Sequence, residues 1–220
     1  MMSKVQDKQA RNFMSKSKKT RKLKVGPKRR SRSAGKMNAA QKRATLQKAV
    51  HWPVMECLIT EAWRETEALT QIAIARQSPT GYIVVAGFIV DLACLGVKNA
   101  LTVGFASLSQ YRQQYRNTLM DSQPITTCSL DLAAKVINTG IDYAKSLGFS
   151  PHPDSQEALI LLQDAQPEAC NEEVPVGGQN GKPFFIAGPY DDVEDVIATL
   201  EQHVGSSNYD YLMPIMPGQP

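Results

Sequence analysis

The residues that follow the most apolar run of the chain are of the types used in covalent catalysis. Asp91, Cys94 and Lys98 occur in the segment D-L-A-C-L-G-V-K, and His152 occurs farther along. The thiolate is the nucleophilic form of cysteine, and a nearby cation such as Lys98 favours it. His152 could then act as the general base, oriented by Asp91 or Asp154. This interpretation predicts a cysteine-dependent hydrolase or acyl-transfer enzyme whose catalytic residues are Cys94, His152 and Asp91.

The same residues also allow a structural interpretation. Cys94 has apolar neighbours, as a small buried core residue would. Asp91 would cap the turn after the apolar run, and Asp154 would cap a helix. His152, between two prolines, would be a packed loop residue. The local sequence favours this second interpretation, and catalysis is kept as the alternative.

Positive charge is concentrated at the start of the chain. Residues 1–50 contain 17 lysines and arginines and one acid, whereas residues 51–220 contain 8 lysines and arginines and 20 acids. Clusters of cations bind nucleic-acid phosphates because condensed counterions are released, and this binding weakens with salt. No aromatic side chain lies between the cations except Phe13, upstream of the two dense clusters, so base stacking is not offered. The residues that we expect to contact nucleic acid are Lys18, Lys19, Arg21, Lys22, Lys24, Lys28, Arg29, Arg30 and Arg32.

The leading hypothesis is therefore a nucleic-acid-associated protein. Residues 1–50 would bind DNA or RNA without sequence readout, and the acidic body would make protein contacts or carry an unknown activity. A third hypothesis is a self-masked interaction module, in which the basic arm folds back on the acidic body. We expect no cofactor and no metal, because the three histidines are scattered and the acids at 191–195 suit the first turn of a helix.

Composition also bears on the cellular compartment. No apolar run reaches the roughly 18–20 residues that span a bilayer, and the basic start of the chain lacks the apolar segment of a secretory signal. The four cysteines are too far apart in sequence for a metal knuckle or a dense disulfide framework. We therefore expect a cytoplasmic protein with reduced thiols and no membrane span.

Secondary-structure patterns come next, because strands and helices must position these residues. The expected strands are 54–60, 69–76 and 82–90, the last two joined by a hairpin turn at 78–81. The expected helices are 38–50, 108–119, 130–147 and 191–204. Residues 154–157 fit a capping box for one more short helix. The pair Asn180-Gly181 predicts a second hairpin over 174–187.

Strands that precede helices predict an α+β fold, with a small, mostly antiparallel sheet, helices packed on it, a late hairpin and a C-terminal helix. The expected domains are a basic, largely disordered arm over residues 1–50 with a short helix at 38–50, a single α+β domain over 51–205 and a loose tail over 206–220.

Three blocks of the body resemble an uncharacterised bacterial protein family. They are F-I-V-D-L-A-C-L-G-V-K-N-A at 88–100, Y-A-K-S-L-G-F-S-P-H-P-D at 143–154 and G-K-P-F-F-I-A-G-P at 181–189. The resemblance implies a bacterial origin and a domain over residues 54–200. It implies no activity, because no function is established for that family. The basic arm lies outside it.

Overall fold

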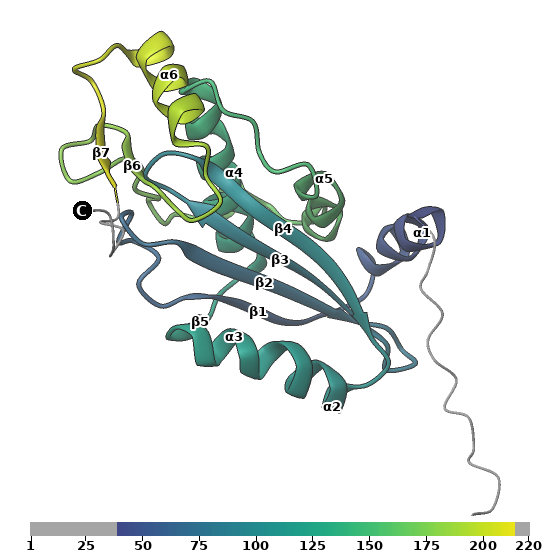
Figure 1. Ribbon diagram of the computed structural model, residues 1–220. Helices are drawn as coiled ribbons and strands as arrows, with labels where there is room; N and C mark the ends of the chain where they lie inside the picture. The colour runs from purple at the N-terminus through teal and green to yellow at the C-terminus, as the bar shows by residue number, and fades with distance from the viewer. Residues whose placement is uncertain (1–38, 214–220) are drawn as a thin grey trace, which may run out of the picture. The chain divides into compact units, whose positions relative to one another are not determined.

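The computed structural model describes residues 39–213, and their fold is α+β as the sequence predicts (Figure 1). Five antiparallel strands form one sheet in the order β4-β3-β2-β1-β5. Their bounds are β1 Val54–Thr60, β2 Thr70–Gln77, β3 Ile83–Asp91, β4 Gly96–Phe105 and β5 Ile125–Thr127. The first three strands confirm the three predicted ones. The predicted hairpin turn also forms, and the Ser78 N–H donates to the Tyr82 carbonyl across it at 2.8 Å.

The first face of the sheet is covered by helical segments from several parts of the sequence (Figure 1). These segments are α1 Ala39–Ala49, α4 Leu130–Ser146, α5 Ser155–Ala158 and the 3-10 turn η2 Leu159–Leu162. Because side chains alternate along a strand, Ile72 and Ile74 of β2 point to this face, where they are buried in one cluster with Ile137 of α4 and Leu161 of η2.

The second face carries one helical segment, which runs from the end of β4 to the start of β5. It consists of α2 Leu108–Tyr111, the π-helical turn η1 Arg112–Arg116 and α3 Asn117–Ser122. The predicted helix at 108–119 is therefore confirmed. Tyr111 is buried against Ala73, Ala75 and Val85 of the sheet, which form a second and smaller apolar cluster.

Helix α4 ends close to the turn between β3 and β4. Gly96, the first residue of β4 after that turn, has a φ of +65°, and a Cβ added there would lie 2.7 Å from the Gly140 carbonyl oxygen. Glycine is needed at this position both for the backbone conformation and for the close approach. The predicted helix at 130–147 is confirmed as α4, and the Ser129 side chain caps its start by accepting the Leu132 N–H.

The late hairpin predicted over 174–187 is wrong. Strand β6 (Phe184–Ile186) pairs in parallel with β7 (Asp210–Leu212), beyond helix α6 (Val193–Val204). The chain before β6 docks instead on the turn after β3: the Gly177 N–H donates to the Leu92 carbonyl at 2.9 Å, and the Phe184 N–H donates to the Ala93 carbonyl at 3.0 Å. The expected loose tail from 206 is corrected at 210–212, where β7 lies beside β6.

Helix α1 confirms the predicted short helix but belongs to the folded body. Leu46 and Ala49 are buried in the core of the first face, so the body begins with this helix and not at His51. The capping box at 154–157 does not form, because Asp154 makes no side-chain capping hydrogen bond. The Glu157 carboxylate instead accepts hydrogen bonds from the side chains of Lys42 in α1 and Thr102 in β4.

Candidate functional site

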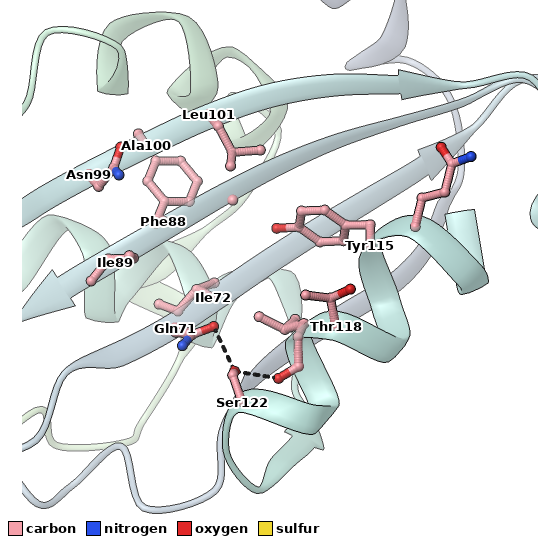
Figure 2. A pocket seen from close by; sticks show the side chains of 13 residues that line it. Gln71, Ile72, Phe88, Ile89, Asn99, Ala100, Leu101, Tyr115, Thr118 and Ser122 are labelled. Carbon is pink, nitrogen blue, oxygen red and sulfur yellow. Dashed lines mark hydrogen bonds between the residues drawn. The ribbon is translucent and has the colours of Figure 1, made fainter. Parts of the chain in front are cut away.

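A groove opens on the second face of the sheet, beside the one helical segment that partly covers that face (Figure 2). Its volume is about 240 Å³. Side chains and backbone of β2, β3 and β4 form its floor, and η1 and α3 form one wall. The residues that decide its chemistry are Gln71, Gly87, Asn99, Leu101, Gln114 and Tyr115.

Gly87 in the middle of β3 gives the groove its depth. The Tyr115 hydroxyl lies directly over it, so close that a Cβ added at Gly87 would be 2.3 Å from the hydroxyl oxygen. The Tyr115 ring extends from η1 toward the sheet (Figure 2). A glycine inside a strand often marks a place where another group approaches the backbone closely, and here that group is a phenol.

The wall is held in place by an aromatic cluster and by one carboxylate. The Tyr111 and Tyr115 rings stack with centroids 6.2 Å apart, and Phe105 meets the Tyr111 ring edge-on at 5.8 Å. Glu56 of β1 accepts hydrogen bonds from the Tyr111 hydroxyl and from Arg116 Nε, both at 2.7 Å. The helical segment therefore has a fixed position on β1 while its Tyr115 side chain faces the groove.

The electrostatics of the groove are those of an uncharged binding site. No charged side chain lines it in the part of the chain that the structure describes. Burial raises the pKa of Tyr115 to about 12, so the phenol is neutral and can donate a hydrogen bond at physiological pH. Its hydroxyl makes no hydrogen bond to another described residue, whereas the Tyr111 hydroxyl donates to Glu56. The groove thus offers apolar surface, the phenol of Tyr115 as a donor, and amide and hydroxyl side chains.

The residues predicted to be catalytic lie elsewhere, in the region between the sheet and α6. Cys94 is completely buried and packs with Leu147 and Phe185. Burial, and then the charge of Asp91, raises the pKa of the Cys94 thiol. Such a thiol is protonated and shielded from solvent, which is the environment that the structural interpretation predicts.

Asp91 is the last residue of β3, and His152 lies in the loop after α4. The Asp91 carboxylate accepts the backbone N–H groups of Ala93 at 2.9 Å and of Cys94 at 3.0 Å, which caps the turn. Burial, the largest influence, raises the pKa of Asp91. His152 Nδ1 accepts the Asp154 N–H at 3.3 Å, and among residues 39–213 no hydrogen bond joins His152 to Cys94 or Asp91. The catalytic role of these residues stays a prediction.

Lys98, the cation expected to favour a Cys94 thiolate, has another partner. Its ammonium nitrogen lies 2.6 Å from the Asp191 carboxylate, and both side chains are largely buried. Asp192 caps α6 by accepting the Asp195 N–H at 3.2 Å. Two of the four acids at 191–195 are therefore used by an ion pair and a helix cap. Within the described residues, no three metal-ligating side chains come together closely enough to hold a metal ion.

The nine basic residues predicted to contact nucleic acid, at positions 18–32, lie outside the described residues. The first cations that the structure does describe are on α1. Lys42 forms an ion pair with Glu157 at 2.6 Å, whereas Arg43 and Lys48 are exposed. Helix α1 thus presents positive charge on its outer side, directly after the basic segment in the sequence.

Sequence reasoning did not identify the groove, although two signals for it were present. Gly87 interrupts an otherwise continuous apolar strand, and Tyr111 and Tyr115 are spaced by four in a segment that is otherwise polar. Residues spaced by four lie on one side of a helix, so the pair could have been assigned to the face that meets the sheet. Which strands the face would meet is a tertiary property.

Comparison with known proteins gives no relatives for this chain. No family model, no curated protein and no solved structure matches it. The resemblance to a bacterial family therefore stays a prediction. None of the helices among residues 39–213 combines the length and the apolar character that crossing a membrane requires.

Proposed function

We propose that the protein associates with nucleic acid through the basic segment before α1. The observation that carries the proposal is the uneven charge, with 17 lysines and arginines and one acid in residues 1–50. Such a segment binds phosphates without reading bases. The acidic body then supplies contacts to other proteins or a second binding site.

The ion pairs of the body support assigning the phosphate contacts to the basic segment before α1. Six cationic side chains of the described residues are bound to carboxylates of the same chain: Lys42, Arg64, Arg76, Lys98, Arg116 and Lys145. Two more, Lys135 and Lys182, donate to backbone carbonyls. A cation already bound to its own protein is a poor partner for an external phosphate. The body therefore has few cations to offer a polyanion, whereas residues 1–38, before α1, contain 14 lysines and arginines.

The test is a salt series with the full-length chain. In one variant the nine cations at 18–32 are replaced by glutamine, and binding to a duplex DNA and to a structured RNA is measured. The wild type should show a slope of log affinity against log salt of up to about −8, because each phosphate contact contributes about −0.9. The variant should lose most of its affinity and most of that slope.

A matched control replaces cations of the body, Arg112→Gln and Lys182→Gln, which are exposed and outside any ion pair of residues 39–213. This control should bind like the wild type. Equal affinity and equal salt slope for the nine-cation variant and the wild type would show the proposal to be wrong. Comparing the two nucleic acids tells whether the segment prefers DNA or RNA.

A second candidate function is favoured by the groove. Its floor is apolar, its lining is uncharged, and the Tyr115 hydroxyl has no hydrogen-bond partner among residues 39–213. With about 240 Å³ it is smaller than the roughly 300–1,000 Å³ of drug-sized sites. The fitting ligand is a small uncharged molecule, or a group of a larger one, with a flat apolar part and one hydrogen-bond acceptor.

Benzamide is a suitable probe, because it has a flat ring and a carbonyl acceptor, and toluene is its control without the acceptor. In NMR titrations benzamide should shift the backbone signals of Gly87 and Leu101 first. The variant Tyr115→Phe should weaken benzamide binding and leave the binding of toluene unchanged. Shifts that are confined to other parts of the body would contradict a binding function of this groove.

A further inference from the structure

Two cysteines lie opposite each other, Cys57 in β1 and Cys128 directly after the end of β5. The pairing of β1 with β5 places Leu58 opposite Thr127, so the next position brings Cys57 opposite Cys128. The Cys128 N–H donates to the Cys57 carbonyl at 3.0 Å, and the two sulfur atoms are 3.4 Å apart. Opposite residues of antiparallel strands have Cα atoms about 4.5–5.5 Å apart, which is within the range that a disulfide can bridge.

The two thiols differ in exposure and in acidity. Cys57 is 6% exposed, whereas Cys128 is only partly buried. The hydrogen bond from Cys57 lowers the pKa of the Cys128 thiol, and the same bond, together with burial, raises the pKa of Cys57. Cys128 is thus the thiol that solvent reaches and that ionises first, which are the two properties of a cysteine that reacts with oxidants.

The other two cysteines provide an internal comparison. Cys94 is completely buried, and burial raises the pKa of its thiol. Cys170 is partly buried and uses its backbone carbonyl to accept a hydrogen bond from Lys135. Within residues 39–213, the only hydrogen bond between two sulfur atoms joins Cys57 and Cys128.

We propose that Cys57 and Cys128 form a redox-active pair, which hydrogen peroxide converts into a disulfide between β1 and the residue that follows β5. The Cys128 thiolate attacks one peroxide oxygen, the O–O bond breaks, and the products are a sulfenic acid on Cys128 and, with one proton, water. The Cys57 sulfur then attacks the sulfenic sulfur. The S–S bond forms, and the sulfenic oxygen leaves with the Cys57 proton as a second water. The two thiols lose two electrons together, and the peroxide gains them.

The location of the pair determines what the disulfide would do. Strand β5 has three residues and pairs with β1 alone, and Cys128 directly precedes Ser129, the capping residue of α4. The bond would fasten the end of the second-face helical segment and the start of α4 to the sheet. It would also close a loop between positions 71 residues apart, which restricts the unfolded chain.

The experiment treats the reduced full-length protein with a small excess of hydrogen peroxide, alkylates the remaining thiols and maps the peptides by mass spectrometry. We expect one crosslink, between the peptides that contain Cys57 and Cys128, with Cys94 and Cys170 alkylated. The melting temperature should rise by on the order of 5–10 °C and return to its original value after reduction.

Two variants separate the pair from general cysteine oxidation. Cys170→Ser should form the crosslink and gain thermal stability as the wild type does. Cys128→Ser should retain a free Cys57 thiol and gain no stability from peroxide. The proposal is overturned if the treated wild type keeps both thiols free, if it crosslinks another pair, or if Cys128 proceeds to a sulfinic acid without a crosslink. These outcomes are read from the wild type, so they do not depend on how well either variant folds.

Discussion

The two faces of the sheet are covered to very different extents. On the first face, α1, α4, α5 and η2 bury a large apolar cluster whose members run from Leu46 to Leu162. On the second face, one helical segment buries a much smaller cluster and leaves a groove over β3. Burial of apolar surface is the main source of folding free energy. The first face should therefore determine stability, and the second face has room for a ligand.

The largest expected effect is on the first face, at Arg76. This side chain is 1% exposed and donates to the carbonyls of Val50 at 2.9 Å, Trp52 at 2.8 Å and Leu161 at 3.0 Å, while its other end pairs with Asp164. Arg76→Met should lower the free energy of unfolding by about 3–5 kcal/mol, because three carbonyls lose their donors in the core. Denaturant unfolding measures this loss.

Asp164 provides the control for that prediction, since its side chain is half exposed. Asp164→Asn should cost about 1 kcal/mol or less, because water can replace the carboxylate partner. If Arg76→Met unfolds at the same denaturant concentration as the wild type, the first face does not depend on this arginine.

An intermediate effect is expected on the second face, at Gly87. Gly87→Ala should lower the free energy of unfolding by about 1–3 kcal/mol, because the new methyl group collides with the Tyr115 hydroxyl. Tyr115→Phe removes that oxygen, so the alanine should cost less in the Tyr115→Phe background than in the wild type. A double-mutant cycle by denaturant unfolding measures the difference. Equal costs in both backgrounds would mean that the phenol does not lie over β3.

The smallest expected effect is a dependence of folding stability on pH. It compares Tyr115, which lines the groove, with Tyr143, which is buried elsewhere. Burial raises the pKa of Tyr115 and of Tyr143 to about 12, above the value of about 10 in an unfolded chain. Between these values the unfolded chain has released a proton that the folded protein retains. The stability from each neutral phenol is therefore fully present below about pH 10 and is lost as the pH rises toward 12.

Denaturant unfolding across that pH range should show a smaller decline in Tyr115→Phe than in the wild type. Tyr143→Phe is the matched control, because the Tyr143 hydroxyl is buried without a partner within the described part of the chain and lies outside the groove. A ligand in the groove should raise the pKa of Tyr115 further and leave that of Tyr143 unchanged. Near-ultraviolet absorbance of tyrosinate reports both values.

Much of the fold could be predicted, because several elements have strong local signals. Helices α4 and α6 combine one apolar stripe with acidic first turns and side-chain caps. Strand β3 is an almost unbroken apolar run. Strand β4 could not be predicted, because Gly96, Asn99 and Gly104 interrupt its pattern, and its pairing with all of β3 supplies the order that its local sequence lacks.

The candidate site could not be predicted for a related reason. A groove forms where the side chains of three strands and one helical segment leave space between them. The local sequence of any one of these segments does not determine that space. At Asn180-Gly181 the local sequence predicted a hairpin that the tertiary structure does not contain. A turn does form there, with the Gly178 N–H donating to the Lys182 carbonyl at 2.7 Å. The strand that follows this turn pairs with β7, which comes after α6 in the sequence, so the turn does not produce a hairpin.

Helix α1 has a mechanical consequence. A pulling force applied to the chain before α1 would enter the body at the start of that helix. The helix is joined to the body by the Lys42–Glu157 ion pair and by its buried Leu46, and the segment after it by the Arg76 bonds to Val50 and Trp52. Such a force would have to break these contacts one after another. They therefore determine the force at which the body would begin to unfold from its first helix.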